Sequence, residues 1–235
     1  MTPPFPVRLV VLDMAGTTVR DDGLVEAAFT RAAATVGVPA DGPEHDRMLA
    51  RVRATMGESK ITVFRHLFGG DEDRARRANA AFEAAYAELV DQGRCAEIPG
   101  AADTIAGLRA EGIKVALTTG FGRPTQEAIL GALGWSGIAD LALCPADAGR
   151  GRPYPDLVLT ALLRLGVDDV RAVAVAGDTA SDMLSARRAG AGVAAGVLTG
   201  AHGRDALLDA GATHVLDSVT GLPGLLSTTR TPRRA

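Results

Sequence analysis

The chain is short of cysteine, of lysine and of aromatic residues, and none of its apolar stretches is long. Its two cysteines, Cys95 and Cys144, cannot build a disulfide framework and have no partners at metal-ligand spacing. Uninterrupted apolar stretches stay below the ~18 residues of a membrane-spanning helix, and Met1–Pro6 lacks the basic and apolar parts of a secretion signal. We therefore expect a protein of the reducing cytoplasm with no membrane partner.

The scarcity of lysine carries the most information. Among the 25 basic residues only Lys60 and Lys114 are lysines, and the other 23 are arginines. Exchange between the two types is harmless on a solvated surface, where only the charge is needed. A guanidinium cannot be deprotonated in a protein, so a reaction that needs a neutral amine resists that exchange. We expect Lys114, at the start of a predicted strand, to be an ordinary surface residue.

The rest of the composition is that of a globular protein. The 235 residues carry a formal net charge of −3 and are 47% apolar, which suffices for one main domain with an insertion. The basic run Arg74–Arg77 directly follows the acidic run Asp71–Asp73, a pattern typical of a solvated helix face. We expect no nucleic-acid partner.

Segments with strand and helix patterns alternate along most of the chain. The predicted strands are 8–14, 114–118, 141–143, 171–177 and 193–198, and the predicted helices between them are 101–111, 124–133, 155–165 and 181–189. This alternation predicts an α/β fold whose core is a Rossmann-like parallel sheet covered by helices on both faces.

The stretch Leu24–Val90 departs from the alternation, because it is rich in Ala and Arg and predicts several helices without a strand. It follows directly on the loop after the first strand, where a helical block can close over a site as a lid. We therefore predict a core made of residues 1–18 and 98–235 and an inserted α-helical cap of residues 19–97. The polar tail Thr228–Ala235 is expected to fray.

Three acidic residues follow strands of the predicted sheet. Asp13 ends the first strand, and Asp178 and Asp182 follow the strand 171–177. A single aspartate there is usually a turn or helix-capping residue. Several at one sheet edge repel one another and are normally stabilised by a divalent cation with oxygen ligands. The four histidines, His45, His66, His202 and His214, share no ligand spacing and are expected to be polar or capping residues.

Two further segments can bind an anion at the same edge. Thr118-Thr119-Gly120 closes the second predicted strand with hydroxyls and a flexible backbone, which suits a phosphate cradle but is also common helix capping. Arg152 lies between Gly151 and Pro153 in a loop that prolines restrain. It is either a surface arginine or a cation aimed at the site.

In this order and spacing, the segments resemble the four motifs of the haloacid dehalogenase superfamily, whose members transfer phosphoryl groups through an aspartyl nucleophile. The first motif is similar to Asp13–Thr18, and the resemblance covers essentially the whole chain. One position departs from the phosphatases of the superfamily. Two residues after Asp13 they carry a second Asp that protonates the leaving alcohol, whereas this chain has Ala15, which cannot transfer a proton.

The subgroup with that departure is phosphonoacetaldehyde hydrolase, or phosphonatase, whose leaving group is a carbon atom. It supplies a cap lysine in a Met-Gly-x-x-Lys segment, which is similar to Met56–Lys60 here. The resemblance implies that Lys60 forms a Schiff base with an aldehyde substrate while Asp13 attacks phosphorus. It implies Mg²⁺ on Asp13, the Ala15 carbonyl and Asp178, supported by Asp182. It also implies a substrate and phosphate site made of Ala15, Gly57, Thr118, Thr119, Gly120 and Arg152.

The resemblance is incomplete at two positions. Phosphonatases commonly have a histidine where this chain has Val63 and an aromatic hydroxyl where it has Phe121, and both groups could assist proton transfer. The resemblance therefore implies that the substrate is phosphonoacetaldehyde or a substituted relative. A phosphomonoesterase for small metabolites on the same fold is the first alternative, and a catalytically silent binding protein is the second. The resemblance further implies a homodimer formed through the cap.

Overall fold

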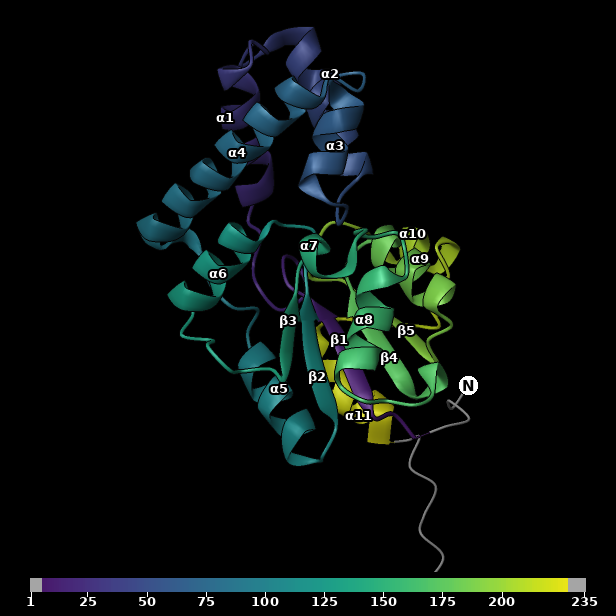
Figure 1. Ribbon diagram of the computed structural model, residues 1–235. Coiled ribbons are helices and arrows are strands. Elements are labelled where there is room, and N and C mark those ends of the chain that lie inside the picture. Colours follow the sequence, from purple (N-terminus) through teal and green to yellow (C-terminus); the bar gives the residue numbers. More distant parts are fainter. Residues whose placement is uncertain (1–5, 228–235) are drawn as a thin grey trace, which may run out of the picture.

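The computed structural model describes residues 6–227 as a six-stranded parallel sheet with a separate group of helices at one end (Figure 1). The strand order is β3-β2-β1-β4-β5-β6. The strands are β1 (Leu9–Asp13), β2 (Lys114–Thr118), β3 (Leu141–Leu143), β4 (Val173–Gly177), β5 (Val193–Val197) and β6 (His214–Leu216). Since β1 lies between β2 and β4, its carboxyl end meets the ends of both neighbours.

Helices cover both faces of the sheet because the residues of each strand alternate between two apolar cores. In β1, Val10 and Leu12 face one core, while Leu9 and Val11 face the other. The first face is covered by α5 (Ala101–Ala110), α6 (Arg123–Ala132) and α11 (Leu222–Ser227). The second is covered by α8 (Asp156–Arg164), α9 (Ala180–Ala189) and α10 (Arg204–Asp209). The short helix α7 (Pro145–Ala148) follows β3.

The chain between β1 and β2 forms the helical group beyond the carboxyl ends of the strands (Figure 1). Its helices are α1 (Leu24–Thr35), α2 (Gly42–Ala54), α3 (Lys60–Leu67) and α4 (Glu72–Leu89), and α4 continues into the π-helix η1 (Val90–Arg94). Phe29, Phe64 and Phe82 pack in their midst, with ring centroids 4.7 to 6.3 Å apart. This apolar cluster continues into the first core of the sheet.

Two neighbouring connections join the helical group to the sheet. Val19 and Glu97 pair as an antiparallel bridge, and the Ile98 N–H donates to the Thr18 carbonyl oxygen at 2.9 Å. The outgoing and returning chains therefore lie side by side, close to the boundaries 18/19 and 97/98 that the sequence suggests for the cap.

The predicted sheet and its covering helices are confirmed to within two residues at most ends. The predicted strand 171–177 begins two residues too early, because Val170–Ala172 forms a 3-10 turn, η2, and β4 begins at Val173. The strand β6 and the helices α7, α10 and α11 were not predicted. Among the described residues no helix is long and apolar enough to cross a bilayer. The predictions for Thr228–Ala235, and for residues 1–5 of the N-terminal segment, lie outside the described residues.

Candidate active site

A cavity of about 1050 Å³ opens where the helical group faces the carboxyl ends of the strands. Asp13, Ala15, Asp178 and Arg152 line it from the sheet side, and Lys60 lines it from the α3 side. Residues that the sequence scatters over 165 positions therefore share one solvent-accessible space. Gly57, Thr119 and Gly120 also line this cavity.

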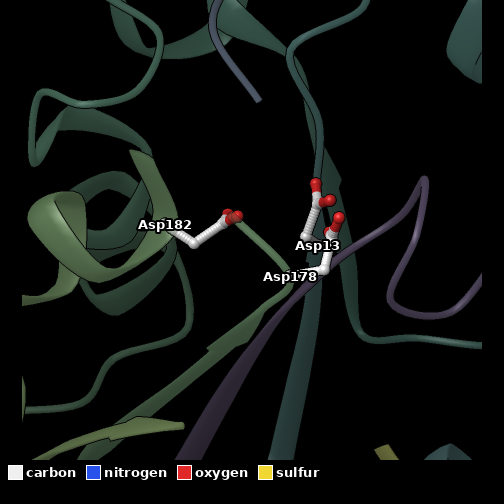
Figure 2. A group of neighbouring side chains, drawn as sticks. All are labelled: Asp13, Asp178 and Asp182. Carbon is white, nitrogen blue, oxygen red and sulfur yellow. The ribbon is translucent and has the colours of Figure 1, made fainter. Parts of the chain in front are cut away.

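Three aspartates gather at the edge of the sheet. Asp13 ends β1, Asp178 follows β4, and Asp182 points toward them from the first turn of α9 (Figure 2). Each offers a carboxylate oxygen, and these oxygens lie within 4.8 Å of one another. Burial raises the pKa of Asp13 to about 6 against the opposing charge of Arg152. Burial, followed by the charges of Asp13 and Asp182, raises the pKa of Asp178 well above its usual range.

Such a cluster suits a hard divalent cation. Its donors are three buried carboxylates whose oxygens lie close together, and burial is the main cause of the raised pKa values of Asp13 and Asp178, so a bound cation would stabilise their charged forms. Asp178 is held in place, because its Oδ1 accepts from the Thr17 hydroxyl at 3.0 Å and its Oδ2 from the Ala201 N–H at 2.8 Å. The residues therefore fit the Mg²⁺ that the sequence predicts.

Arg152 is the cation of this cluster. Its guanidinium, 5% exposed, forms ion pairs with Asp13 at 2.6 Å and with Asp182. Although burial lowers it, the charges of Asp13 and Asp182 raise the pKa of Arg152, which therefore stays protonated. Within the described residues its Nε has no hydrogen-bond partner. A buried, unpartnered N–H next to Asp13 is a ready donor for an anionic oxygen.

Asp182 is engaged on both of its carboxylate oxygens. One contacts Arg152, and the other accepts from the Thr179 N–H at 3.1 Å and its hydroxyl at 2.5 Å as part of a helix-capping box. Asp182 thus combines the helix-capping role with a position in the carboxylate cluster, two alternatives that the sequence left open.

The segment Met56–Lys60 reaches down from the helical group onto the sheet edge. Gly57 has φ +85°, and a Cβ there would meet the Thr179 hydroxyl at 2.4 Å. A Cβ on Gly120 would meet the Glu58 carbonyl oxygen at 2.4 Å. Glycine is therefore needed at Gly57 in the helical group and at Gly120 in the loop after β2, because a larger side chain at either position would separate the two. The sequence predicted both glycines only as substrate-binding positions.

Lys60 is buried at the first turn of α3, with 5% of its surface exposed. Its Nζ lies 5.1 Å from the centroid of the Phe121 ring and 3.5 Å from the Glu58 carbonyl oxygen. Burial, together with the positive charge of Arg152, lowers the pKa of Lys60 to about 8. About a tenth of this amine is therefore neutral at pH 7, far more than of a solvated lysine. Lys114 lies on the exposed start of β2, as expected.

The two threonines at the end of β2, Thr118 and Thr119, differ in position: one contacts the sheet and the other lines the cavity. The Thr118 hydroxyl is buried and donates to the Leu12 carbonyl oxygen at 3.4 Å, whereas Thr119 and Gly120 line the cavity. The Thr119 hydroxyl accepts from the Phe121 N–H at 3.1 Å. Of the predicted phosphate site, Thr118 is the member that the structure directs toward the sheet.

The loop after β5 contributes residues that the sequence analysis missed. The Ala201 N–H and the His202 N–H hold Asp178, and the Thr199 hydroxyl donates to the Gly16 carbonyl oxygen at 2.6 Å. His202 accepts from the Ala180 N–H at 2.8 Å through Nδ1, which confirms the expected capping role, and it also lines the cavity. Gly200 and Gly203, within and directly after this segment, were the available signal, since loops that follow strands often carry a site.

A sequence profile of haloacid dehalogenase-like hydrolases matches residues 7–190, most of the chain. The protein belongs to the haloacid dehalogenase-like hydrolases. It is an enzyme of this type. The segments that resemble the family's motifs lie together at the carboxyl edge of the sheet, where they supply the aspartate cluster, Arg152 and the loop after β2.

Individual relatives narrow the resemblance. A phosphonoacetaldehyde hydrolase of Syntrophobacter fumaroxidans is 34% identical over 203 residues, which cover 79% of this hydrolase and 70% of the relative. A probable phosphatase of Dickeya dadantii, IndB, is 29% identical over 219 residues, 92% of each chain. The hydrolase is therefore similar to phosphonatases in sequence and to a shorter probable phosphatase in length.

A solved structure agrees with the sequence relatives. A phosphonoacetaldehyde hydrolase-like protein of Oleispira antarctica superposes with a TM-score of 0.81 at 25% identity, over 97% of this chain and 94% of that protein. The agreement covers both the sheet and the helical group.

Proposed function

We propose that this hydrolase cleaves the carbon–phosphorus bond of a small phosphono-aldehyde, phosphonoacetaldehyde or a substituted relative, and releases phosphate. The observation that carries the proposal is Lys60, a buried amine with a pKa of about 8 that lines the same cavity as Asp13. The sequence similarity to phosphonoacetaldehyde hydrolases supports it.

The chemical difficulty is the leaving group, because a carbanion is a poor one. The neutral Lys60 amine condenses with the aldehyde and releases water, which gives a protonated imine two bonds from phosphorus. The electrons of the breaking carbon–phosphorus bond then flow into the imine, and the carbon leaves as an enamine. Protonation and hydrolysis of the enamine return the free lysine and the aldehyde product.

Residues at the carboxyl edge of the sheet bind and transfer the phosphoryl group. A carboxylate oxygen of Asp13 attacks phosphorus and forms an aspartyl phosphate, which water hydrolyses. Arg152, Thr119 and Gly120, which line the cavity, hold the phosphoryl oxygens. Mg²⁺, held by Asp13, the Ala15 carbonyl and Asp178 with support from Asp182, would screen the negative charges of nucleophile and substrate from each other.

A phosphomonoesterase is the second candidate, favoured by the similarity to the probable phosphatase IndB over nearly the full length of both chains. Ala15 disfavours the phosphomonoesterase, because an alcohol leaving group requires an acid two residues after Asp13 and alanine cannot donate a proton. An enamine leaving group does not require that acid.

The test combines turnover with trapping. We expect phosphate release from phosphonoacetaldehyde in the presence of Mg²⁺, and irreversible inactivation when borohydride is added with the substrate. Mass spectrometry should find the reduced adduct on Lys60, with Lys114 as the internal control. Lys60→Arg should be inactive although it keeps the charge. Wild-type rates in Lys60→Arg, or turnover of sugar or nucleotide phosphates far above that of phosphonates, would establish the phosphomonoesterase instead.

The proposal includes the domain arrangement. Residues 19–97 act as a cap that opens to admit substrate and closes to bring Lys60 over Asp13, and cap-to-cap contact forms a homodimer. The paired connections at Val19 and Glu97 support a hinge there. Cys95 and Cys144, both free thiols, agree with the reducing cytoplasm as the site of action.

A further inference from the structure

The condensation at Lys60 requires more proton transfer than the amine itself can provide. An ammonium must lose a proton before it attacks the aldehyde, and the hydroxyl of the resulting carbinolamine must gain one before it leaves as water. Asp13 cannot supply this proton transfer, because in the proposed reaction its carboxylate attacks phosphorus. The side chains of Val63 and Phe121, both buried beside Lys60, carry no proton to transfer.

The acidic side chains around the cavity can be compared one by one. Asp13 and Asp178 belong to the carboxylate cluster. Glu26 is held by Arg53 through two hydrogen bonds of 2.8 and 2.7 Å. Asp22 is exposed. Glu58 does not line this cavity but a neighbouring one of about 900 Å³, which Lys60 also lines.

Asp21 is the remaining acid. It lines the cavity with Lys60 and is only partly exposed. No Lys, Arg or His in the described part of the chain forms an ion pair with it. Its Oδ1 accepts from the Val25 N–H at 3.0 Å, and its carbonyl oxygen accepts from the Leu24 N–H at 2.7 Å. One oxygen thus fixes the carboxyl at the start of α1, and the other is left for a ligand.

The electrostatics agree with this geometry. Among the carboxylates around Lys60, Asp21 opposes most strongly the fall of the lysine pKa that burial and Arg152 cause, ahead of Asp13 and Asp178. Burial also raises the pKa of Asp21 above that of a solvated aspartate. The Tyr86 hydroxyl, buried and unpartnered among the described residues, is an alternative donor, but it is not among the residues that line the cavity.

We infer that Asp21 is the proton-transfer residue of the Lys60 reaction, placed by the linker between β1 and α1 on the cap side of the cavity. The Asp21 carboxylate takes a proton from the Lys60 ammonium, and the neutral amine adds to the aldehyde. The amine proton passes to the new oxygen to give the carbinolamine. Asp21 then returns its proton to the carbinolamine hydroxyl, water departs, and a protonated imine remains beside the Asp21 carboxylate. The inference rests on the proposed function, since it concerns the imine.

The test measures imine formation and phosphoryl chemistry separately. Imine formation is followed as the rate at which cyanoborohydride and phosphonoacetaldehyde label Lys60, read by mass spectrometry. Phosphoryl chemistry is followed with p-nitrophenyl phosphate, whose leaving group needs neither an imine nor an acid. Inorganic phosphate binding in the presence of Mg²⁺ shows that each variant keeps its site.

Asp21→Asn keeps the oxygen that accepts from Val25 but cannot carry the proton, and we expect labelling and turnover of phosphonoacetaldehyde to fall 10- to 100-fold. Activity on p-nitrophenyl phosphate and phosphate binding should stay within about twofold, and Asp21→Glu should recover part of the labelling rate. Asp22→Asn removes the same charge from the adjacent residue of the cavity, and Tyr86→Phe removes the phenol. Both should label at the wild-type rate.

The outcomes separate the two proposals. Wild-type labelling in Asp21→Asn, or an equal loss on phosphonoacetaldehyde and p-nitrophenyl phosphate, would overturn the role of Asp21 while leaving the carbon–phosphorus hydrolase in place. If Asp22→Asn lowers the Lys60 labelling rate as much as Asp21→Asn does, the effect of Asp21 is one of local negative charge and its role in proton transfer is overturned. Absence of any Lys60 adduct in the wild type would overturn the proposed function and this inference together.

Discussion

The backbone N–H of Lys60 donates to the carbonyl oxygen of Gly120 at 3.1 Å. This hydrogen bond joins the helical group to the loop after β2 at the point where the buried amine enters the cavity. The position of Lys60 relative to Asp13 is therefore set by a main-chain contact. The neighbouring positions Gly57 and Gly120 have no space for a larger side chain.

Gly120→Ala should test that contact. The added Cβ would meet the carbonyl oxygens of Glu58 at 2.4 Å and Gly57 at 2.8 Å, so the segment before α3 must move away from the sheet. We expect turnover of phosphonoacetaldehyde to fall at least about 10-fold, because small misplacements of reacting groups are costly, with an unchanged circular dichroism spectrum. Gly131→Ala in α6 is the matched control, since a Cβ there meets nothing within 4 Å. Equal activity in the two variants would contradict the role of the contact.

Asp13→Asn should abolish phosphate release while the protein stays folded. The amide keeps the shape of the side chain and can still accept from Arg152, but it lacks the nucleophilic charge. Steady-state phosphate assays provide the measurement, and Asp22→Asn provides a control on the same cavity. Retention of more than a few per cent of the wild-type rate would exclude Asp13 as the nucleophile.

Asp178→Asn should remove the response to Mg²⁺. Asp13, Asp178 and Asp182 are buried close together, so a bound cation stabilises the folded wild type and raises its melting temperature. We expect that rise, and the activity, to disappear with a chelator and to be strongly reduced in the variant. Asp169→Asn, a change at a partly exposed aspartate that pairs with Arg171 and does not line the cavity, is the control. Full wild-type activity in excess chelator would contradict the assignment.

The carboxylate cluster was predictable because strand ends are readable from sequence. Asp13 and Asp178 directly follow buried apolar strands, and parallel strands bring their carboxyl ends to one edge. Lys60 was predictable for a different reason, because an isolated lysine stands out in an arginine-rich chain and its segment resembles the phosphonatase cap motif.

Other features depend on contacts that no local pattern encodes. The sequence around Asp21 resembles any polar loop before a helix, and its place in the cavity follows from the path of the linker beside Glu97. His202 was predicted as a capping residue, which α9 confirms, but its place at the cavity depends on how the loop after β5 folds. The strand β6 is only three partly exposed residues, too short for a period to be recognised.

The buried amine of Lys60 should also make stability depend on pH in a predictable direction. Its pKa is about 8 in the folded protein and about 10.5 when solvated. Between those values the unfolded chain binds more protons than the folded one, so the free energy of unfolding contributed by this group rises with pH. Below pH 8 both states are protonated, and the full cost of burying the ammonium is present.

Lys60→Met replaces the amine with an apolar side chain of similar length, so it should remove this cost. We expect the metal-free variant to be more stable than the wild type at pH 7 by about 3 kcal/mol. The difference should shrink as pH rises from 8 and level off above 10.5, where the wild-type lysine is largely neutral in both states. Urea unfolding at a series of pH values measures it. Lys114→Met at the exposed end of β2 is the control for the loss of a lysine that is not buried. A difference for Lys60→Met that stays constant from pH 7 to 10.5 would mean that the ammonium is not destabilised in the folded protein, and the neutral nucleophile on which imine formation depends would lose its physical basis.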